Sequence, residues 1–377
     1  MRTSKGHILK VAILAFVMLL TGGFIYALDD SEPQALPVPP MVRAMGGAFT
    51  GVANDENSVF YNPAGYALVD DDIISVFSLG VRANIDDSAL KLWEAILTGV
   101  DLSDPTNMNN YLSNATLALG AAGPIYFGRV GNNYGFAFYN NLAFRFSSKP
   151  GAMMPRANLN IYSDVGFAGG YGFELPFLDN LYAGFNFKVL MRIKSQVEGT
   201  ALYVMDSLSD TSNLPIAKAI GFGADMGLLY RPIPVVSIGL CAKDFFGTNF
   251  SSWENLNQAQ QTFEDSYIKP RVAIGFAFYP MAMTGESKNF KDFVIAVDYS
   301  NLLDYSSVFT NIKFGVSFNT LKIITIRAGF DGGYLTGGIG FDFNFFHTNI
   351  VYYVDELGAY PGANPAQNLM LNFAFRW

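Results

Sequence analysis

The chain has 377 residues, of which 15% are charged and another 15% are aromatic. Soluble domains carry about 25% charged residues, so this chain is short of charge and rich in rings. The formal net charge of −8 argues against nucleic acid as a partner, because that binding needs a basic face. With two histidines and one cysteine, a catalytic or metal site built on these residues is disfavoured, and we expect no enzyme, no cofactor and no bound metal.

Residues 1–27 have the order of a secretory signal peptide. Basic residues precede the apolar run Val11–Leu20, and Ala27 places a small residue at the expected cleavage site. The alternative is an uncleaved membrane anchor. Because no later run has the roughly 20 apolar residues of a membrane-spanning helix, we expect the mature chain to be either soluble outside the inner membrane or a β-barrel.

From residue 72 onward, apolar residues alternate with small or polar ones, which predicts strands with two different faces. The polar faces are rich in glycine and alanine with scattered charges, as in the lumen of a transmembrane barrel. In a bilayer such a sheet must close, because open edges leave backbone groups unpaired in lipid. The sequence therefore predicts an all-β, antiparallel transmembrane barrel over 72–377. We expect fourteen strands, at residues 72–81, 122–129, 134–147, 160–173, 180–194, 216–231, 234–247, 267–280, 291–303, 308–319, 321–332, 334–345, 347–355 and 368–377.

An even strand number suits a bacterial barrel with both termini in the periplasm, and most of the long gaps between predicted strands fall on the opposite, extracellular side. The last row ends in Phe373, Phe375 and Trp377. The barrel-assembly machinery recognises a C-terminal signal, and an aromatic last residue at the end of an apolar row resembles such a signal. We therefore expect the protein in the outer membrane of a diderm bacterium, with outer-membrane lipid around it.

The segment 28–71 does not alternate and is expected to fold separately. Gly46 and Gly47 permit tight turns, and Asn62 followed by Pro63 is a helix start with a capping residue. Fourteen strands make a barrel wider than the eight-stranded kind that side chains can fill. We expect 28–71 to plug the lumen as a hatch; the alternative is a plain periplasmic linker.

Two stretches of this segment, Arg43–Phe49 and Phe60–Gly65, resemble the hatch of the FadL/TodX family of outer-membrane transporters. The second stretch continues the Asn-Pro pair with Ala64 and Gly65, and the Asn-Pro-Ala triplet is the family's mark. The resemblance implies a fourteen-stranded barrel that takes up hydrophobic small molecules, such as long-chain fatty acids, by passive diffusion. Some relatives serve protein secretion, so the alternative is a secretion or structural partner without lipid cargo. A general porin would need an open lumen, which a hatch opposes.

The resemblance also implies a gap in the wall at a kinked third strand, through which cargo leaves sideways into the bilayer. The predicted third strand carries Asn140 and Asn141 in an otherwise apolar region, and the predicted fourth strand carries Gly169 and Gly170. Asparagine tolerates unusual backbone angles, and glycines inside a strand mark bulges or bends. We expect the lateral opening there; the alternative is an ordinary polar side chain near the membrane surface.

Two further features concern the cargo itself. Asp86 can cap an amphipathic helix with Leu90, Trp93 and Leu97 on one face. This helix is either a surface collector of hydrophobic molecules or a loop helix packed on the barrel mouth. A carboxylate inside the lumen would need a cation. We favour three lumen-facing cations near the suspected gap as carboxylate-binding candidates, namely Arg145, Lys188 and Arg192.

Overall fold

The computed structural model describes residues 38–69, 72–102, 104–122, 127–209, 214–257, 263–285, 290–304, 308–321, 323–356 and 361–376. The expected signal peptide and the terminal Trp377 lie outside these residues. No helix within the described ranges is both long and apolar enough to cross a bilayer.

Antiparallel strands form one closed wall, in which the last strand pairs with the first. The second wall strand consists of two pieces, β2 and β3, and both pair with β1 and with β4. Counted in this way the wall has fourteen strands, which confirms the predicted number. The wall strands are β1 (Ile73–Asn84), β2 (Thr116–Ala122), β3 (Phe127–Gly131), β4 (Tyr134–Lys149), β5 (Arg156–Glu174), β6 (Leu181–Thr200), β7 (Ile216–Ile233), β8 (Val236–Lys243), β12 (Arg271–Phe278), β13 (Phe290–Tyr299), β14 (Ile312–Thr320), β15 (Ile324–Asp331), β16 (Tyr334–Phe343), β17 (Phe346–Glu356) and β18 (Pro365–Arg376).

The apolar rows of the strands face outward. On β18, Leu371, Phe373 and Phe375 are 39–41% exposed, whereas Met370 and Asn372 between them are 2% and 4% exposed and face the interior. Exposed apolar residues of this kind recur on the strands around the wall. Exposing such an apolar surface to water is unfavourable, whereas the hydrocarbon of a bilayer accommodates it.

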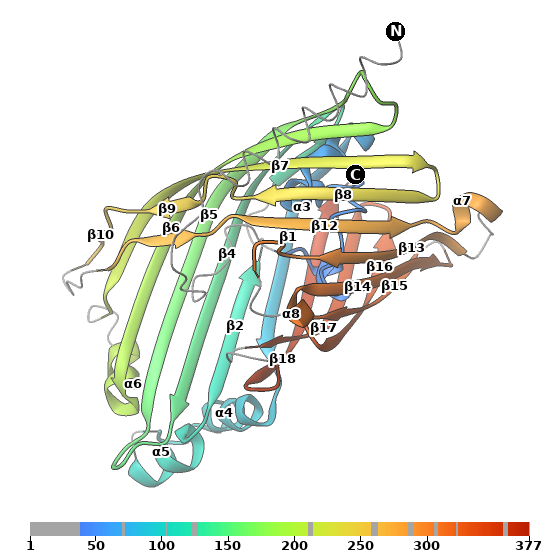
Figure 1. Ribbon diagram of the computed structural model, residues 1–377. Helices are drawn as coiled ribbons and strands as arrows, with labels where there is room; N and C mark the ends of the chain where they lie inside the picture. The colour runs from blue at the N-terminus through green and yellow to red at the C-terminus, as the bar shows by residue number, and fades with distance from the viewer. Residues whose placement is uncertain are drawn as a thin grey trace.

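The wall is taller on one side than on the other. Strands β4 to β7 have 16 to 20 residues, whereas β8 and β12 have 8 each. In Figure 1 the long strands run to the lower left, where three helices lie near their ends. These helices share an apolar core with the ends of β2 and β4 to β6. They are α4 (Asp87–Thr98), α5 (Pro105–Leu112) and α6 (Ala201–Ser209).

The second wall strand is broken, and the single strand predicted at 122–129 is wrong. The last pair of β2 with β4 is Ala122 with Asn141, and the first pair of β3 is Phe127 with Phe138. Five residue steps on one strand therefore face three on the other, so the second strand carries two extra residues at this point. The sequence between the two pieces contains Pro124, which has no N–H to donate to a ladder.

The described part of the N-terminal segment, residues 38–69, packs against the inner face of the wall. It contains α2 (Pro40–Ala44), α3 (Ser58–Tyr61) and the 3₁₀ helix η1 (Pro63–Leu68). Its buried apolar side chains form one core with inward-facing residues of β3 to β5, β7, β12 and β13. The remaining described elements lie in connections: β9 (Thr248–Phe250), β10 (Glu254–Asn255), β11 (Ser266–Ile268), α7 (Met281–Thr284) and α8 (Val308–Asn311).

Candidate functional site

Asn62 joins the N-terminal segment to the wall. Its side chain is fully buried, and its Nδ2 donates hydrogen bonds to the carbonyl oxygens of Thr50 (3.0 Å) and Leu228 (3.1 Å). Its Oδ1 accepts a bond from the Ala64 N–H (3.2 Å), so Asn62 caps η1, which starts at Pro63 as the Asn-Pro pair predicts. One amide thus connects two parts of the segment and strand β7.

The glycines of the same motifs allow a close approach of backbone to backbone. Gly46 and Gly47 have φ values of +64° and +80°, which favour glycine. A Cβ on Gly46 would lie 2.6 Å from the carbonyl oxygen of Phe314 on β14, and a Cβ on Gly65 would collide with the carbonyl of Ala53. Larger residues would therefore separate the segment from the wall or from itself.

Two anchors of this segment were missed in the sequence. On β13, Oδ2 of Asp298 accepts bonds from the backbone N–H groups of Phe49 (2.9 Å) and Thr50 (2.7 Å). The hydroxyl of Tyr66 donates to Oδ1 of Asn186 on β6 (2.6 Å). An acidic residue at an inward-facing position predicts that it has a partner. The sequence does not show that this partner is the backbone of a distant segment.

Charged side chains of the segment also reach the wall. Arg43 lies 3.0 Å from Asp355 on β17, and Glu56 forms an ion pair with Arg376 at the end of β18. Burial and the neighbouring Glu56 raise the pKa of Asp55 to about 7. The charge of the segment near residues 55–57 therefore changes when Asp55 gains or loses its proton near neutral pH.

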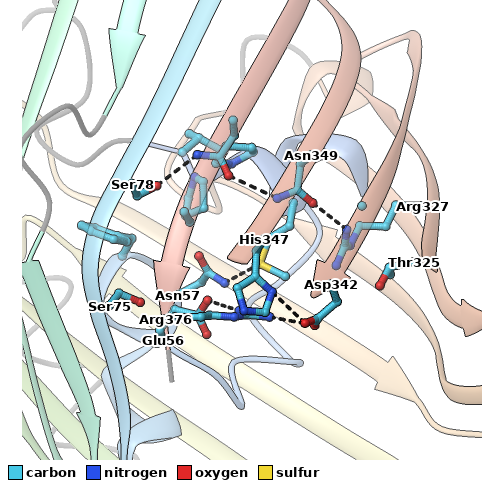
Figure 2. Close-up of a pocket in the computed structure, with 18 of the residues that line it drawn as sticks. Glu56, Asn57, Ser75, Ser78, Thr325, Arg327, Asp342, His347, Asn349 and Arg376 are labelled. Carbon is cyan, nitrogen blue, oxygen red and sulfur yellow. Dashed lines mark hydrogen bonds and ion pairs between the residues drawn. The ribbon is translucent and has the colours of Figure 1, made fainter. Parts of the chain in front are cut away.

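A cavity of about 100 Å³ lies between the N-terminal segment and the wall. Figure 2 shows its polar side, where His347, Asp342 and Arg376 converge with Glu56 of the segment. The segment contributes apolar residues as well, including Phe60. The complete lining consists of Val38, Pro39, Pro40, Met41, Glu56, Asn57, Phe60, Ser75, Ser78, Tyr139, Thr325, Arg327, Gly340, Phe341, Asp342, His347, Asn349, Asn372, Ala374 and Arg376.

Arg327 is the cation in this cavity without a carboxylate partner among the described residues. Its guanidinium donates to Oδ1 of Asn349 (3.2 Å), whereas Arg376 is engaged by Glu56. His347 is 8% exposed and its Nδ1 lies 3.0 Å from Asp342, while its Nε2 has no hydrogen-bond partner within the described ranges. The alternating pattern marks Arg327 only as one of many inward-facing cations, so sequence reasoning did not single it out.

The asparagine pair and the glycine pair lie on neighbouring strands, as expected, but they do not face each other. Asn140 pairs with Val165 and Asn141 with Asp164, whereas Gly169 and Gly170 pair with Phe136 and Gly135. The ladder between β4 and β5 is continuous over its whole length, since glycine can fill a regular strand position. On the opposite edge of β4, Tyr139 and Asn140 lie beside the break between β2 and β3. The irregular part of the wall is therefore on the other side of the asparagines.

Two of the three carboxylate-binding candidates are already paired. Lys188 Nζ lies 2.7 Å from both Asp225 and Asp244, and Arg192 makes two bonds of 2.7 and 2.8 Å to Asp164. These groups are almost completely buried. A cargo carboxylate would have to displace an aspartate there, at the cost of leaving a buried charge unpaired.

Arg145 differs from these two candidates. It is exposed to the interior, and no carboxylate lies within ion-pair distance of it among the described residues. Its backbone neighbours are Ala118 on β2 and Asn160 on β5. Arg145 therefore stays available to an anionic group, although the three candidates do not form one site.

The predicted helix after β1 is present as α4, and Asp86 caps it by accepting a bond from the Ala89 N–H (3.0 Å). The helix packs through its alanines and Leu92, whereas Leu90 and Leu97 are 51% and 82% exposed. Trp93 is partly buried against the helical cluster. The helix thus packs on the end of the barrel and leaves two of the three named side chains exposed, and its role as a surface collector stays a prediction.

No protein-family model and no curated relative matches the sequence. Among solved structures, the toluene transporter TbuX of Ralstonia pickettii has a TM-score of 0.51 at 13% identity, over 90% of this chain and 97% of that one. The Pseudomonas putida toluene transporter TodX has a TM-score of 0.47 at 11% identity, with the same coverage. A Pseudomonas aeruginosa FadL homologue has a TM-score of 0.35 at 10% identity, over 90% and 98%. The resemblance to the FadL/TodX fold expected from the sequence is confirmed.

Proposed function

We propose that this chain is an outer-membrane channel through which hydrophobic compounds, long-chain fatty acids or similar molecules, diffuse passively. In this proposal residues 38–69 act as a hatch that closes the lumen, and cargo leaves sideways into the bilayer. The observation that carries the proposal is the position of the cavity. Ser75 and Ser78 on β1 and Tyr139 on β4 line it, and these residues border the break between β2 and β3.

The break is a suitable exit because the described pairs on its two sides differ in register by two residues, so a regular ladder cannot run through it. Between Ser75 and Gly80, β1 has no described partner on the side of the second strand. Opening an intact ladder in lipid would cost several kcal/mol for each unpaired backbone group. Apolar cargo prefers the bilayer, since each buried CH₂ gains roughly 0.8 kcal/mol over water. In this proposal lateral exit is downhill for apolar cargo, and it uses the place where the register of the wall changes.

The polar wall of the cavity suits cargo with an anionic head. Arg327 donates to Asn349 and has no carboxylate partner in the described chain, and Phe60 and Tyr139 offer apolar surface to a tail in the same cavity. A carboxylate needs a cation when it leaves water, so Arg327 supports an acid as cargo. A neutral hydrocarbon, as named for the solved transporter TbuX, is the second candidate and would not need Arg327.

The proposal is tested by closing the break. Deletion of Gly123 and Pro124 removes the two extra residues, so that β2 and β3 can pair with β4 as one strand. We expect uptake of a labelled long-chain fatty acid to fall while the amount of heat-modifiable barrel at the surface stays the same. A matched control removes Ala152 and Met153, two exposed residues between β4 and β5.

The outcomes separate the two functional candidates. Unchanged uptake in the Gly123–Pro124 deletion would place the exit elsewhere. If the unaltered protein itself takes up no fatty acid and no toluene, transport is wrong and the secretion or structural role is favoured. A loss of uptake in both deletions would reflect poor assembly, and the gel shift detects that directly.

A further inference from the structure

The connection after β8 enters the lumen at the end of β7 remote from the N-terminal segment. We call its residues Asp244–Glu254 the strap. Thr248 and Phe250 of the strap are fully buried, whereas Ile220 and Phe222 on the outer face of β7 are 56% and 67% exposed. A Cβ on Gly221, which faces inward between these two, would lie 2.7 Å from the Phe250 ring. The strap therefore lies on the inner face of β7.

A buried ion cluster fastens the strap to two wall strands. Lys188 on β6 donates to Asp225 on β7 and to Asp244 of the strap, both at 2.7 Å. Asp244 also accepts a bond from the hydroxyl of Thr248 (2.7 Å). Removing one member of a buried ion pair leaves an uncompensated charge, so this cluster holds the strap firmly only while all members are present.

A second contact lies deeper along the strap. The guanidinium of Arg192 lies 4.7 Å from the centre of the Phe250 ring, and the Trp253 ring is 6.3 Å from the same ring. Lys188 is engaged by the ion cluster, and Arg192 by Asp164 and the Phe250 ring, so neither is free for cargo. Both cations hold a loop in place.

The strap is longer than the distance that it spans. Its first residues are joined to β7 by the Phe245 N–H, which donates to the carbonyl of Ala224 (2.7 Å), and its far end by the pairing of Glu254 with Lys218. Nine residue steps, from 245 to 254, thus accompany six steps of β7, from 224 to 218. The strap's backbone pairs instead with β11, from Thr248 with Ile268 to Phe250 with Ser266, and residues 219–223 of β7 have no described strand partner on this edge.

Between its two ends the strap is held on β7 by side chains, namely the Lys188–Asp244 pair and the Phe250 ring, so it can leave that face together with β11 while both ends stay tied. We propose that the strap is a second gate, in series with the hatch, which is fastened by Lys188 and Asp244 and must leave the inner face of β7 for cargo to pass. Its role in passage rests on the proposed function, but its movement does not. Two discrete positions, seated and lifted, are the kind of two-state element that can control access.

The first test measures movement without any cargo. In a Cys241→Ala background, Thr248→Cys is treated on intact cells with a membrane-impermeant maleimide. We expect slow labelling in the otherwise unaltered chain and labelling roughly a hundredfold faster when Asp244→Asn is added, because the buried ammonium then loses one carboxylate. Asn249→Cys, which is exposed in the same strap, is the control and should react rapidly in both backgrounds.

The second test locks the strap. Gly223 and Thr248 are replaced by cysteines, since a Cβ on Gly223 would touch the Thr248 hydroxyl oxygen. We expect the oxidised pair to lower fatty-acid uptake about tenfold and a reductant to restore it. Equal uptake in the fully oxidised and reduced forms, or equal labelling of the Thr248→Cys variant with and without Asp244→Asn, would overturn the gate. If the unaltered protein transports nothing, the labelling test alone still decides whether the strap moves.

Discussion

Replacing Asn62 by alanine should loosen the N-terminal segment from the wall. The Asn62 side chain has no exposed surface, and its amide makes three hydrogen bonds to backbone groups. One of these bonds reaches Leu228 on β7, and the other two hold the segment's own turn around Thr50 and Ala64. The substitution therefore removes the cap of η1 and a tie to the barrel in one step.

The size of the effect follows from the number of bonds. A hydrogen bond contributes about 1 kcal/mol net, and three lost bonds give about 3 kcal/mol. This free energy corresponds to a roughly 150-fold larger fraction of molecules in which the segment is both undocked and unfolded. Water that enters the site would reduce the loss, whereas unpaired buried carbonyl groups would increase it.

Hydrogen exchange measured by mass spectrometry on the purified barrel tests this value. Peptides from residues 38–69 should exchange roughly 150-fold faster in Asn62→Ala, while peptides from β4 to β7 keep their protection. Asn54→Ala is the matched control, because Asn54 is an exposed asparagine of the same segment. Equal exchange in all three proteins would refute the view that Asn62 holds the segment in place.

Two further predictions concern the barrel as a whole. Deletion of residues 43–68 should raise single-channel conductance in planar bilayers far above that of the intact protein, because fourteen strands enclose a lumen that side chains alone do not fill. Equal conductance would place the segment outside the conducting path. Removal of Trp377 should reduce the folded, heat-modifiable form in the outer membrane, because the apolar row would end at Phe375, and normal surface levels would contradict its role in assembly.

The strands and their two faces follow from local sequence. A period of two fixes which residues share a face, and the exposed Leu371 and Phe373 beside buried Met370 and Asn372 lie as the alternation predicts. The start of η1 at Asn62-Pro63 is also local, since capping and a fixed proline φ act within one turn. These features need no knowledge of distant residues.

The contents of the lumen were decided by tertiary structure. Alternation places Lys188, Arg192 and Arg327 equally on the inner face, but the register of neighbouring strands and the path of a loop give the first two aspartate partners and leave Arg327 with Asn349. In the same way, the break in the second wall strand depends on how many residues each neighbour contributes between paired positions. The sequence by itself therefore determined the fold and its outer surface, because the alternation within each single strand decides which of its residues face the lipid. The site depends on contacts between segments that are far apart in the chain, and only the folded barrel brings these together.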